Sequence, residues 1–187
     1  MAHSPFTIGI SLGDPAAIAV VERQADTYKV GYLRRLAVHE PYPAIVAEVI
    51  KLRNQLKPAL YDRFPDKFPR HRGPGVIIDI STVGESVFDL FRGRGFAPIG
   101  IMLTTSVEYR DGALQMLPRA ALASNLKALM HRGALKLAHS LPNIDALASA
   151  LQEFCSEPAN DNFGLAVTIA LWAAATVSPT RVEPLNV

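Results

Sequence analysis

The stretch FTIGISLGDPAAIAVVERQADTYKVGYLRRLA, residues 6–37, contains three apolar segments rich in β-branched residues. Such segments favour β-strands, which we expect over 6–11, 17–23 and 28–37. The first connection, 12–15, holds Gly, Asp and Pro, which are common in turns. Parallel neighbours need long crossover connections. Strands joined by such short turns are therefore predicted to form an antiparallel meander.

The next part of the chain combines a helix, a loop and a buried strand. From Pro43 onward, apolar residues recur at helical spacing. Residues 57–74 hold four prolines and five lysines or arginines without any periodicity, which predicts an exposed loop. Residues 75–80, GVIIDI, are almost entirely apolar and predict a strand buried on both faces in the middle of a sheet. A helix at 84–94 and a strand at 97–104 would complete a right-handed parallel crossover.

The C-terminal part is predicted to be mainly helical. Asp111-Gly112 favours a hairpin turn within 107–116. Residues 134–138 are expected to form a short edge strand. Apolar side chains recur at helical spacing in three further segments, at 118–132, 143–154 and 163–176.

This order of elements is that of an RNase H-like fold: three meander strands, then helix, strand, helix, strand and several helices. We therefore expect an α/β architecture with a mixed sheet of five or more strands. The sheet would combine the antiparallel meander with parallel strands and carry helices on both faces. A chain of 187 residues suits one domain, which we place at 1–178, followed by a tail at 179–187.

Composition narrows the class of protein. Hydrophobic residues make up 49% of the chain and charged residues 19%, which argues against disorder. The net charge of +2 is too small to indicate nucleic-acid binding by itself. The longest apolar run, 163–177, has about 15 residues, whereas a membrane-spanning helix needs about 20. Because the chain has one cysteine, Cys155, and no apolar leader, we expect a cytoplasmic protein without membrane contact.

Two aspartates are candidates for a functional site. Asp79 lies near the carboxyl end of its predicted strand, where α/β sheets form their sites. An aspartate among apolar residues is costly to bury unless it is paired or bound to metal, and the alternative is a surface carboxylate that caps the following loop. Asp161 precedes the last helix and is either a helix cap or a second carboxylate beside Asp79. In the second case the pair would bind Mg²⁺ or Mn²⁺, which favour carboxylate oxygens.

A two-metal phosphodiesterase site needs about three carboxylates. The third is expected at the end of the strand 6–11, where this chain has Ser11, a neutral and weaker ligand. Asp14 lies in the turn nearby, and Glu85 follows the strand that holds Asp79. A third ligand from Asp14 or Glu85 would favour an active nuclease, whereas two aspartates alone would favour a degenerate site.

Three blocks of the sequence carry a family resemblance. They read GISLGDPAAIAVVE at 9–22, VIIDISTVG followed by VFDLFR within 76–92, and NDNFGLAVTIALW at 160–172. These blocks resemble GIDLG with DPTAIAVVE, VVDATGVG with VVDLLR, and HDDLVLALALALW in the C-terminal nuclease domain of phage and prophage terminase large subunits. The resemblance implies an RNase H-like fold, a catalytic site that uses Mg²⁺ or Mn²⁺, and a role in DNA packaging.

The sequence departs from this family at the implied site. The family's first catalytic aspartate falls on Ser11, and the second is kept as Asp79. The last block keeps Asp161 but has Asn162 where a second aspartate is usual. No Gly-x-x-x-x-Gly-Lys-Ser/Thr phosphate loop occurs, so we expect the packaging ATPase half to be absent from these residues. The resemblance therefore implies the fold more firmly than the activity.

The implied partners are double-stranded DNA, a packaging ATPase and other phage proteins. The family's Pro-Lys before a helix is similar to Pro118-Arg119, and Arg119 and Arg110 are the candidates for contacts with DNA phosphates. Three functions stay open. The first is a terminase-like nuclease of prophage origin with weakened cleavage. The second is a non-catalytic RNase H-like remnant that binds DNA or protein, and the third is a resolvase-like enzyme of the same fold.

Overall fold

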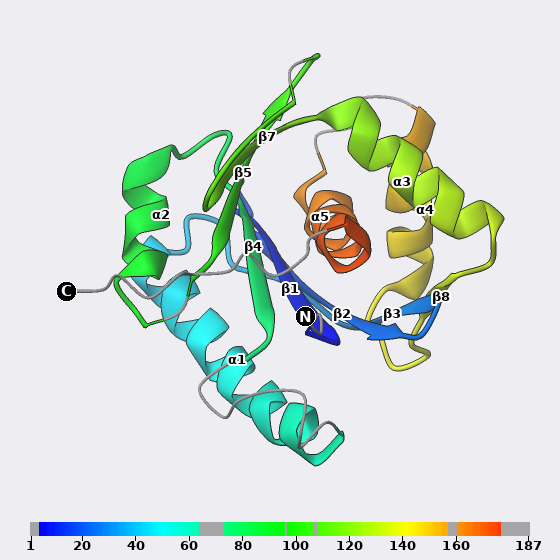
Figure 1. The fold of residues 1–187 in the computed structure, drawn as a ribbon, viewed down its shortest axis with the longest axis horizontal. Helices are drawn as coiled ribbons and strands as arrows, with labels where there is room; N and C mark the ends of the chain where they lie inside the picture. The colour runs from blue at the N-terminus through cyan, green and yellow to red at the C-terminus, as the bar shows by residue number, and fades with distance from the viewer. Residues whose placement is uncertain (1–3, 64–72, 96, 107, 157–160, 177–187) are drawn as a thin grey trace.

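One mixed β-sheet organises the protein. The structure is a computed structural model that describes residues 4–63, 73–95, 97–106, 108–156 and 161–176. Within these residues, eight strands follow the order β6-β7-β5-β4-β1-β2-β3-β8 (Figure 1). The predicted mixed sheet of five or more strands is thereby confirmed. The predicted tail at 179–187 lies outside the described residues.

The meander consists of β1 (Phe6–Ser11), β2 (Ala17–Gln24) and β3 (Thr27–Arg35). These strands pair antiparallel, as predicted. All six residues of β1 are buried, because β1 lies between β2 and β4 inside the sheet and helices cover both faces. β1 is therefore a central strand against which both hydrophobic layers pack.

The predicted parallel crossover is also present. β4 (Gly75–Asp79) pairs parallel to β1 on one side and to β5 (Ile99–Thr104) on the other. α2 (Glu85–Arg92) connects β4 to β5. The carboxyl ends of β1 and β4 consequently lie side by side near the centre of the sheet.

Short strands form both edges of the sheet. β6 (Tyr109–Asp111) and β7 (Leu114–Pro118) make the predicted hairpin, whose turn includes Gly112 at φ 54°. β8 (Leu135–Leu137) pairs parallel to β3 at the opposite edge, which confirms the predicted edge strand. Because each edge strand has three residues, neither offers a long row of backbone groups to another chain.

α1 (Tyr42–Arg63) is longer than predicted. The prediction of an exposed loop from residue 57 is wrong for 57–63, which continue the helix with Pro58 inside it. Leu60 in this last part is fully buried in the hydrophobic cluster under α1. Burial of this turn therefore outweighs the low helix propensity of proline. The rest of the predicted loop up to residue 72 lies outside the described residues.

Helices cover both faces of the sheet, as predicted (Figure 1). α1 and α2 lie on one face, and α5 (Asn162–Thr176) lies on the other, with α3 (Arg119–His131) and α4 (Ile144–Ser156) outside it. The buried side chains form two clusters, one on each side of the sheet. On β4, Ile77 belongs to the α5 side and Ile78 to the α1 side, since successive strand residues point to opposite faces.

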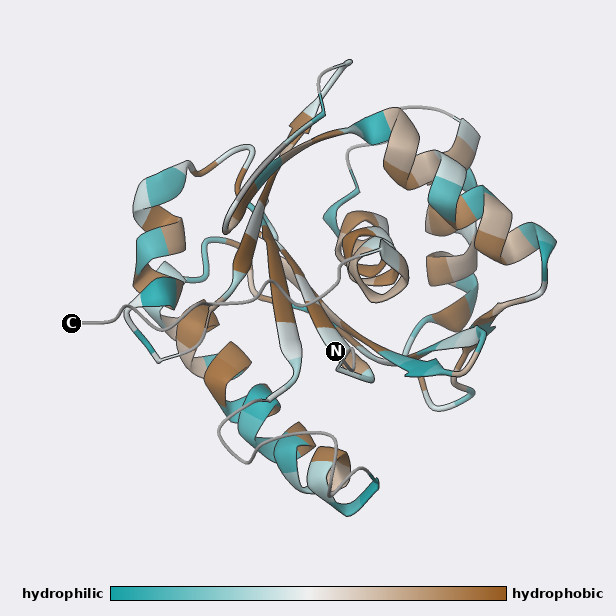
Figure 2. Ribbon diagram, viewed as in Figure 1, coloured by the Kyte–Doolittle hydropathy of each residue, from teal (hydrophilic) through white to brown (hydrophobic). Residues whose placement is uncertain are grey.

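α5 is apolar around its whole circumference, as the colouring in Figure 2 shows. It is buried between the sheet and the pair α3 and α4. Gly9 on β1 permits this close packing, because a Cβ there would lie 2.2 Å from the Ala166 carbonyl oxygen and 2.8 Å from the Ala170 Cβ. Across the described parts of the chain, no helix combines the length and the apolar character needed to span a membrane.

Candidate functional site

Two polar side chains lie at the carboxyl ends of adjacent central strands. Ser11 ends β1 and Asp79 ends β4, and the two residues are direct partners in the parallel register. Ser11 is completely buried and Asp79 is 4% exposed. The carboxyl ends of parallel strands are where α/β sheets form ligand sites, so this is the candidate site of the chain.

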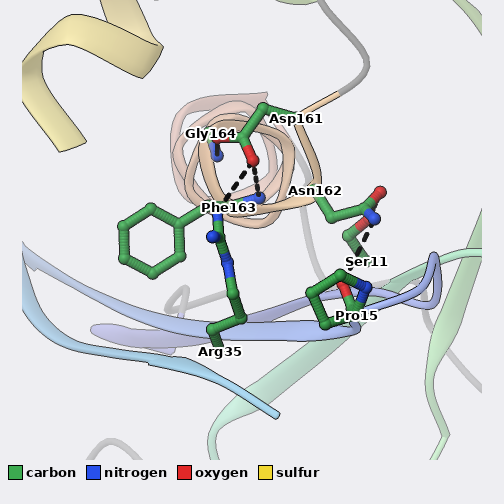
Figure 3. A network of polar contacts seen from close by, with 7 residues as sticks. All are labelled: Ser11, Pro15, Arg35, Asp161, Asn162, Phe163 and Gly164. Atoms are coloured by element: carbon green, nitrogen blue, oxygen red, sulfur yellow. Dashed lines mark hydrogen bonds and ion pairs between the residues drawn. The ribbon is translucent and has the colours of Figure 1, made fainter. Parts of the chain in front are cut away.

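A hydrogen bond joins Ser11 to the start of α5 (Figure 3). Ser11 Oγ donates to Asn162 Oδ1 at 3.0 Å, and Asn162 Nδ2 donates to the Pro15 carbonyl oxygen at 3.2 Å. Gly13 leaves the space for this amide, since a Cβ at Gly13 would lie 2.1 Å from Asn162 Nδ2. Asn162, which the sequence analysis did not place among the site residues, is thus the residue of α5 that contacts the end of β1.

Asp79 is held by the loop that follows β4. Its Oδ1 accepts hydrogen bonds from the Ser81 backbone N–H at 3.0 Å and from Ser81 Oγ at 2.5 Å. Ser81 Oγ in turn accepts a bond from the Leu103 N–H at 2.8 Å. Burial raises the pKa of the Asp79 carboxyl, and the bonds from Ser81 and the positive charge of Arg119 offset part of that rise. Asp79 therefore caps the loop, as one alternative predicted, but it does so as a buried group and not at the surface.

Replacing Asp79 by asparagine is expected to stabilise the fold at pH 7. A carboxyl whose pKa is higher in the folded than in the unfolded state destabilises the fold once the pH exceeds the unfolded value of about 4. Asp79→Asn removes this ionisation penalty, whereas at pH 3.5 both states of the wild type are largely protonated and the gain should shrink. Urea unfolding of both proteins at the two pH values measures the difference.

Asp26→Asn, in an exposed turn, is the matched control and should change stability equally little at both pH values. A difference between Asp79→Asn and the wild type that is the same at pH 7 and pH 3.5 would contradict the raised pKa.

Asp161 caps the N-terminus of α5. Its Oδ1 lies 3.4 Å from the Phe163 N and its Oδ2 lies 3.2 Å from the Gly164 N (Figure 3). Oδ1 also accepts a bond from Arg35 Nη2 at 3.0 Å, and the Arg35 guanidinium lies 5.0 Å from the centre of the Phe163 ring. These contacts match the helix-cap alternative. The role of Asp161 as a metal ligand stays a prediction.

Asp161→Ala is expected to lower the free energy of unfolding by about 1–2 kcal/mol, because it leaves two N–H groups of α5 without their cap. Asp161→Asn keeps a good capping side chain and loses only the charge, so it should cost less than half as much. Urea unfolding of both variants measures this. Equal losses would show that the ion pair with Arg35, and not the cap, carries the effect.

The other predicted carboxylates have different surroundings. Asp14 Oδ1 accepts the His39 backbone N–H at 2.9 Å, and Asp14 Oδ2 lies 2.6 Å from His39 Nδ1. Asp14 is thus engaged with the loop after β3. Glu85 is exposed and begins α2, where a negative charge suits the positive end of the helix.

Of the two arginines predicted to contact DNA, Arg119 lies beside the candidate site. It is the first residue of α3, and its guanidinium carbon lies 4.5 Å from the centre of the Phe154 ring. Burial lowers the pKa of Arg119, and the negative charge of Asp79 raises it in part, so the two charges act on each other. Arg110 lies in β6 at the edge of the sheet, and its side chain is outside the described part.

The donors at this site do not fit a two-metal centre. Asp79 supplies one carboxylate, whereas Ser11 and Asn162 supply a neutral hydroxyl and amide that bond to each other. Among the described residues, no group of three or more His, Cys, Asp or Glu side chains is placed to hold a metal ion. Hard divalent cations need several anionic oxygens, so these residues would hold such an ion weakly.

Solved terminase structures have the same fold as this chain. The large terminase of a thermophilic bacteriophage superposes with a TM-score of 0.58 at 11% identity, over 90% of this chain and 39% of its own. The human cytomegalovirus terminase nuclease domain superposes with a TM-score of 0.56 at 12% identity, over 92% of this chain and 86% of its own. The large terminase nuclease of another thermophilic phage, G20c, solved with bound zinc, superposes with a TM-score of 0.51 at 18% identity, over 88% of this chain and 78% of its own. The chain therefore has a terminase nuclease-like fold, and the predicted RNase H-like class is confirmed.

The chain spans about two fifths of the length of the first of these proteins, the bacteriophage large terminase. The G20c nuclease was also solved with bound cobalt, and the cytomegalovirus domain after soaking in Mn. No protein-family model matches the sequence, and no curated protein sequence matches it. At these identities the likeness establishes the fold of the chain.

Proposed function

We propose that this chain is a terminase-type nuclease domain of prophage origin whose metal-dependent DNA cleavage is weakened or lost. It would engage double-stranded DNA in the host cytoplasm, together with a separate packaging ATPase or other phage proteins. The terminase nuclease-like fold supports the family, and so do the three sequence blocks that resemble terminases. The proposal that DNA cleavage is weakened rests on the residues at the carboxyl ends of β1 and β4.

The observation that carries the proposal is the hydrogen bond between Ser11 and Asn162 beside Asp79. The resemblance puts aspartates of the family at both of these positions. Two divalent cations bring four positive charges, and even with Asp161 as a second ligand beside Asp79 the carboxylates offset only two of them. If DNA phosphates offset part of the remainder, Mg²⁺ or Mn²⁺ would bind only with substrate present. Cleavage would then be slow.

A plasmid assay tests this function. We expect the wild type with excess Mn²⁺ to cleave supercoiled plasmid slowly or not at all, while an active terminase nuclease in the same buffer linearises it rapidly. Rapid linearisation by the wild type that disappears in Asp79→Ala would contradict the proposal and establish an active enzyme.

The neutral Ser11–Asn162 pair equally favours a second function, non-catalytic binding of DNA, because binding to phosphates does not require the lost carboxylates. Fluorescence anisotropy with a labelled duplex in EDTA tests it. Binding that weakens as salt is added would support this function. The slope of log K against log salt concentration should also become shallower by about one in Arg119→Gln. The absence of binding at low salt would exclude it.

A further inference from the structure

Arg35, the last residue of β3, lies in line with the candidate site. In the register of the sheet, Arg35 pairs with Ala17, Ala17 with Ser11, and Ser11 with Asp79. These four residues form one row across the adjacent strands β3, β2, β1 and β4. Arg35 and Ser11 both bond to the start of α5, so the row faces α5. A positively charged side chain therefore belongs to the same row as Asp79.

Arg35 binds the Asp161 carboxylate at its own end of this row. Arg35 and Asp161 lie to one side in Figure 3, and the contact between Ser11 and Asn162 lies to the other. Adjacent strands are about 4.8 Å apart, so about 14 Å separates the backbones of Arg35 and Asp79. Carboxylates that share a divalent cation have to approach within about 5 Å of each other. Arg35 thus holds Asp161 toward the end of the row away from Asp79.

Both oxygens of Asp161 are engaged in this position. Oδ1 accepts the bond from Arg35 Nη2 at 3.0 Å, and Oδ2 lies 3.2 Å from the Gly164 N. The Arg35 guanidinium is further fixed by the Phe163 ring, whose centre lies 5.0 Å away. The side chains of Arg35 and Asp161 are 53% and 33% exposed, so an ion from solution can reach them. Such an ion would be repelled by Arg35, because like charges repel each other.

Asp79, at the other end of the row, also interacts with an arginine. Burial raises the pKa of the Asp79 carboxyl and lowers the pKa of Arg119, and the charge of each group offsets part of the shift of the other. Arg119 begins α3, directly after β7. Each of the two carboxylates that a metal site would use is therefore matched by a guanidinium from another element of the fold.

We propose that Arg35 takes the place of a divalent cation at Asp161 and thereby keeps Mg²⁺ and Mn²⁺ out of the candidate site. Arg35 is a positioning residue in this role, because it acts through Asp161. The inference rests on the proposed function and deepens it. Cleavage would be weak for two reasons: aspartates are missing at Ser11 and Asn162, and the carboxylates that remain are neutralised by arginines.

Titration calorimetry with MnCl₂, at low ionic strength and without DNA, tests the proposal. We expect Arg35→Gln to bind Mn²⁺ at least about fivefold more tightly than the wild type, because a nearby positive charge is removed and Asp161 is released. A purely structural role of Arg35 would not raise the affinity for an ion. Excess Mn²⁺ should likewise raise the melting temperature of Arg35→Gln more than that of the wild type.

Three further variants locate the effect. Arg35→Lys keeps the charge and should bind Mn²⁺ as weakly as the wild type. Arg35→Gln combined with Asp161→Asn lacks the released carboxylate and should lose the gain. Arg34→Gln is the matched control, because Arg34 is equally exposed at 52% but pairs with Glu48 of α1, at 2.7 Å, on the other face of the sheet. It should leave the affinity unchanged. Circular dichroism verifies that each variant is folded.

Three results would overturn the proposal. The first is a folded Arg35→Gln that binds Mn²⁺ no more tightly than the wild type. The second is an equal gain in Arg35→Lys or in Arg34→Gln, which would mean that the charge at this position is not responsible. The third is a gain that persists without the Asp161 carboxylate. These outcomes are separate from those of the proposed function, because the titration contains no DNA and the plasmid assay uses no variant of Arg35.

Discussion

Gly9→Val is expected to abolish folding or to lower the free energy of unfolding by about 5 kcal/mol or more. Gly9 lies in the centre of β1, and a Cβ alone would lie 2.2 Å from the Ala166 carbonyl oxygen and 2.8 Å from the Ala170 Cβ on α5. Both are parts of a packed helix and not ends of flexible side chains. To accept valine, α5 would have to move away from the sheet and open the larger of the two hydrophobic clusters.

Gly31→Val is the matched control for this experiment. Gly31 also lies in a strand, β3, but a Cβ there would have no neighbour within 4 Å. Valine suits an exposed strand position, so this variant should be as stable as the wild type or slightly more stable. Far-ultraviolet circular dichroism and urea unfolding measure both variants. A Gly9→Val protein with a wild-type midpoint would show that α5 does not rest directly on β1.

The second large effect is expected from restoring acidic residues at the candidate site. Ser11→Asp combined with Asn162→Asp would place two more carboxylates beside Asp79, where the wild type has a neutral hydrogen bond of 3.0 Å. Three anionic side chains in contact bind Mn²⁺ far better than one, so we expect the affinity to rise by at least about 100-fold, with the appearance of plasmid cleavage. Titration calorimetry and the plasmid assay measure the two effects.

The same variant should become dependent on metal for its stability. Two carboxylates in place of a hydroxyl and an amide repel each other in a buried site, so the melting temperature in EDTA should fall below that of the wild type. Mn²⁺ should recover the loss, because an ion that binds only the folded state stabilises it. Adding Asp79→Ala to the double variant is the control and should remove most of the gain in affinity. Equal Mn²⁺ affinities of the wild type and the double variant would contradict the assignment of Ser11 and Asn162 to ligand positions.

Much of the sheet could be predicted because its signals are local. Alternating and continuous apolar runs identified the meander and the buried strand at Gly75, and the length of their connections determined which pairs are antiparallel and which parallel. Asp111-Gly112 located the hairpin in the same way. The loop prediction at residues 57–63 was wrong because the helix there depends on contacts that are distant in the sequence. Pro58 and the charged residues around it argue against a helix locally, whereas the burial of Leu60 against the sheet is a tertiary effect.

At the candidate site too, the features that could be predicted are those that depend on neighbouring residues in the sequence. The sequence placed Asp79 at the end of a buried strand and allowed Asp161 to be a helix cap, since both statements depend on neighbouring residues. Asn162 had only one signal, its place in a block where terminases have a second aspartate. Its actual partner, Ser11, is 151 residues away in the chain.

The sequence by itself thus determined the class of fold, the antiparallel meander and the parallel crossover, and its resemblance to terminases implied that an aspartate is missing at Ser11. Only the tertiary structure decided which residue of the last block reaches that position. The reason is geometric: Gly9 and Gly13 let α5 approach β1 closely, and this approach turns Asn162 toward Ser11 while Asp161 faces Arg35. A close approach between two distant segments depends on the packing of the whole core, which no local pattern of residues records.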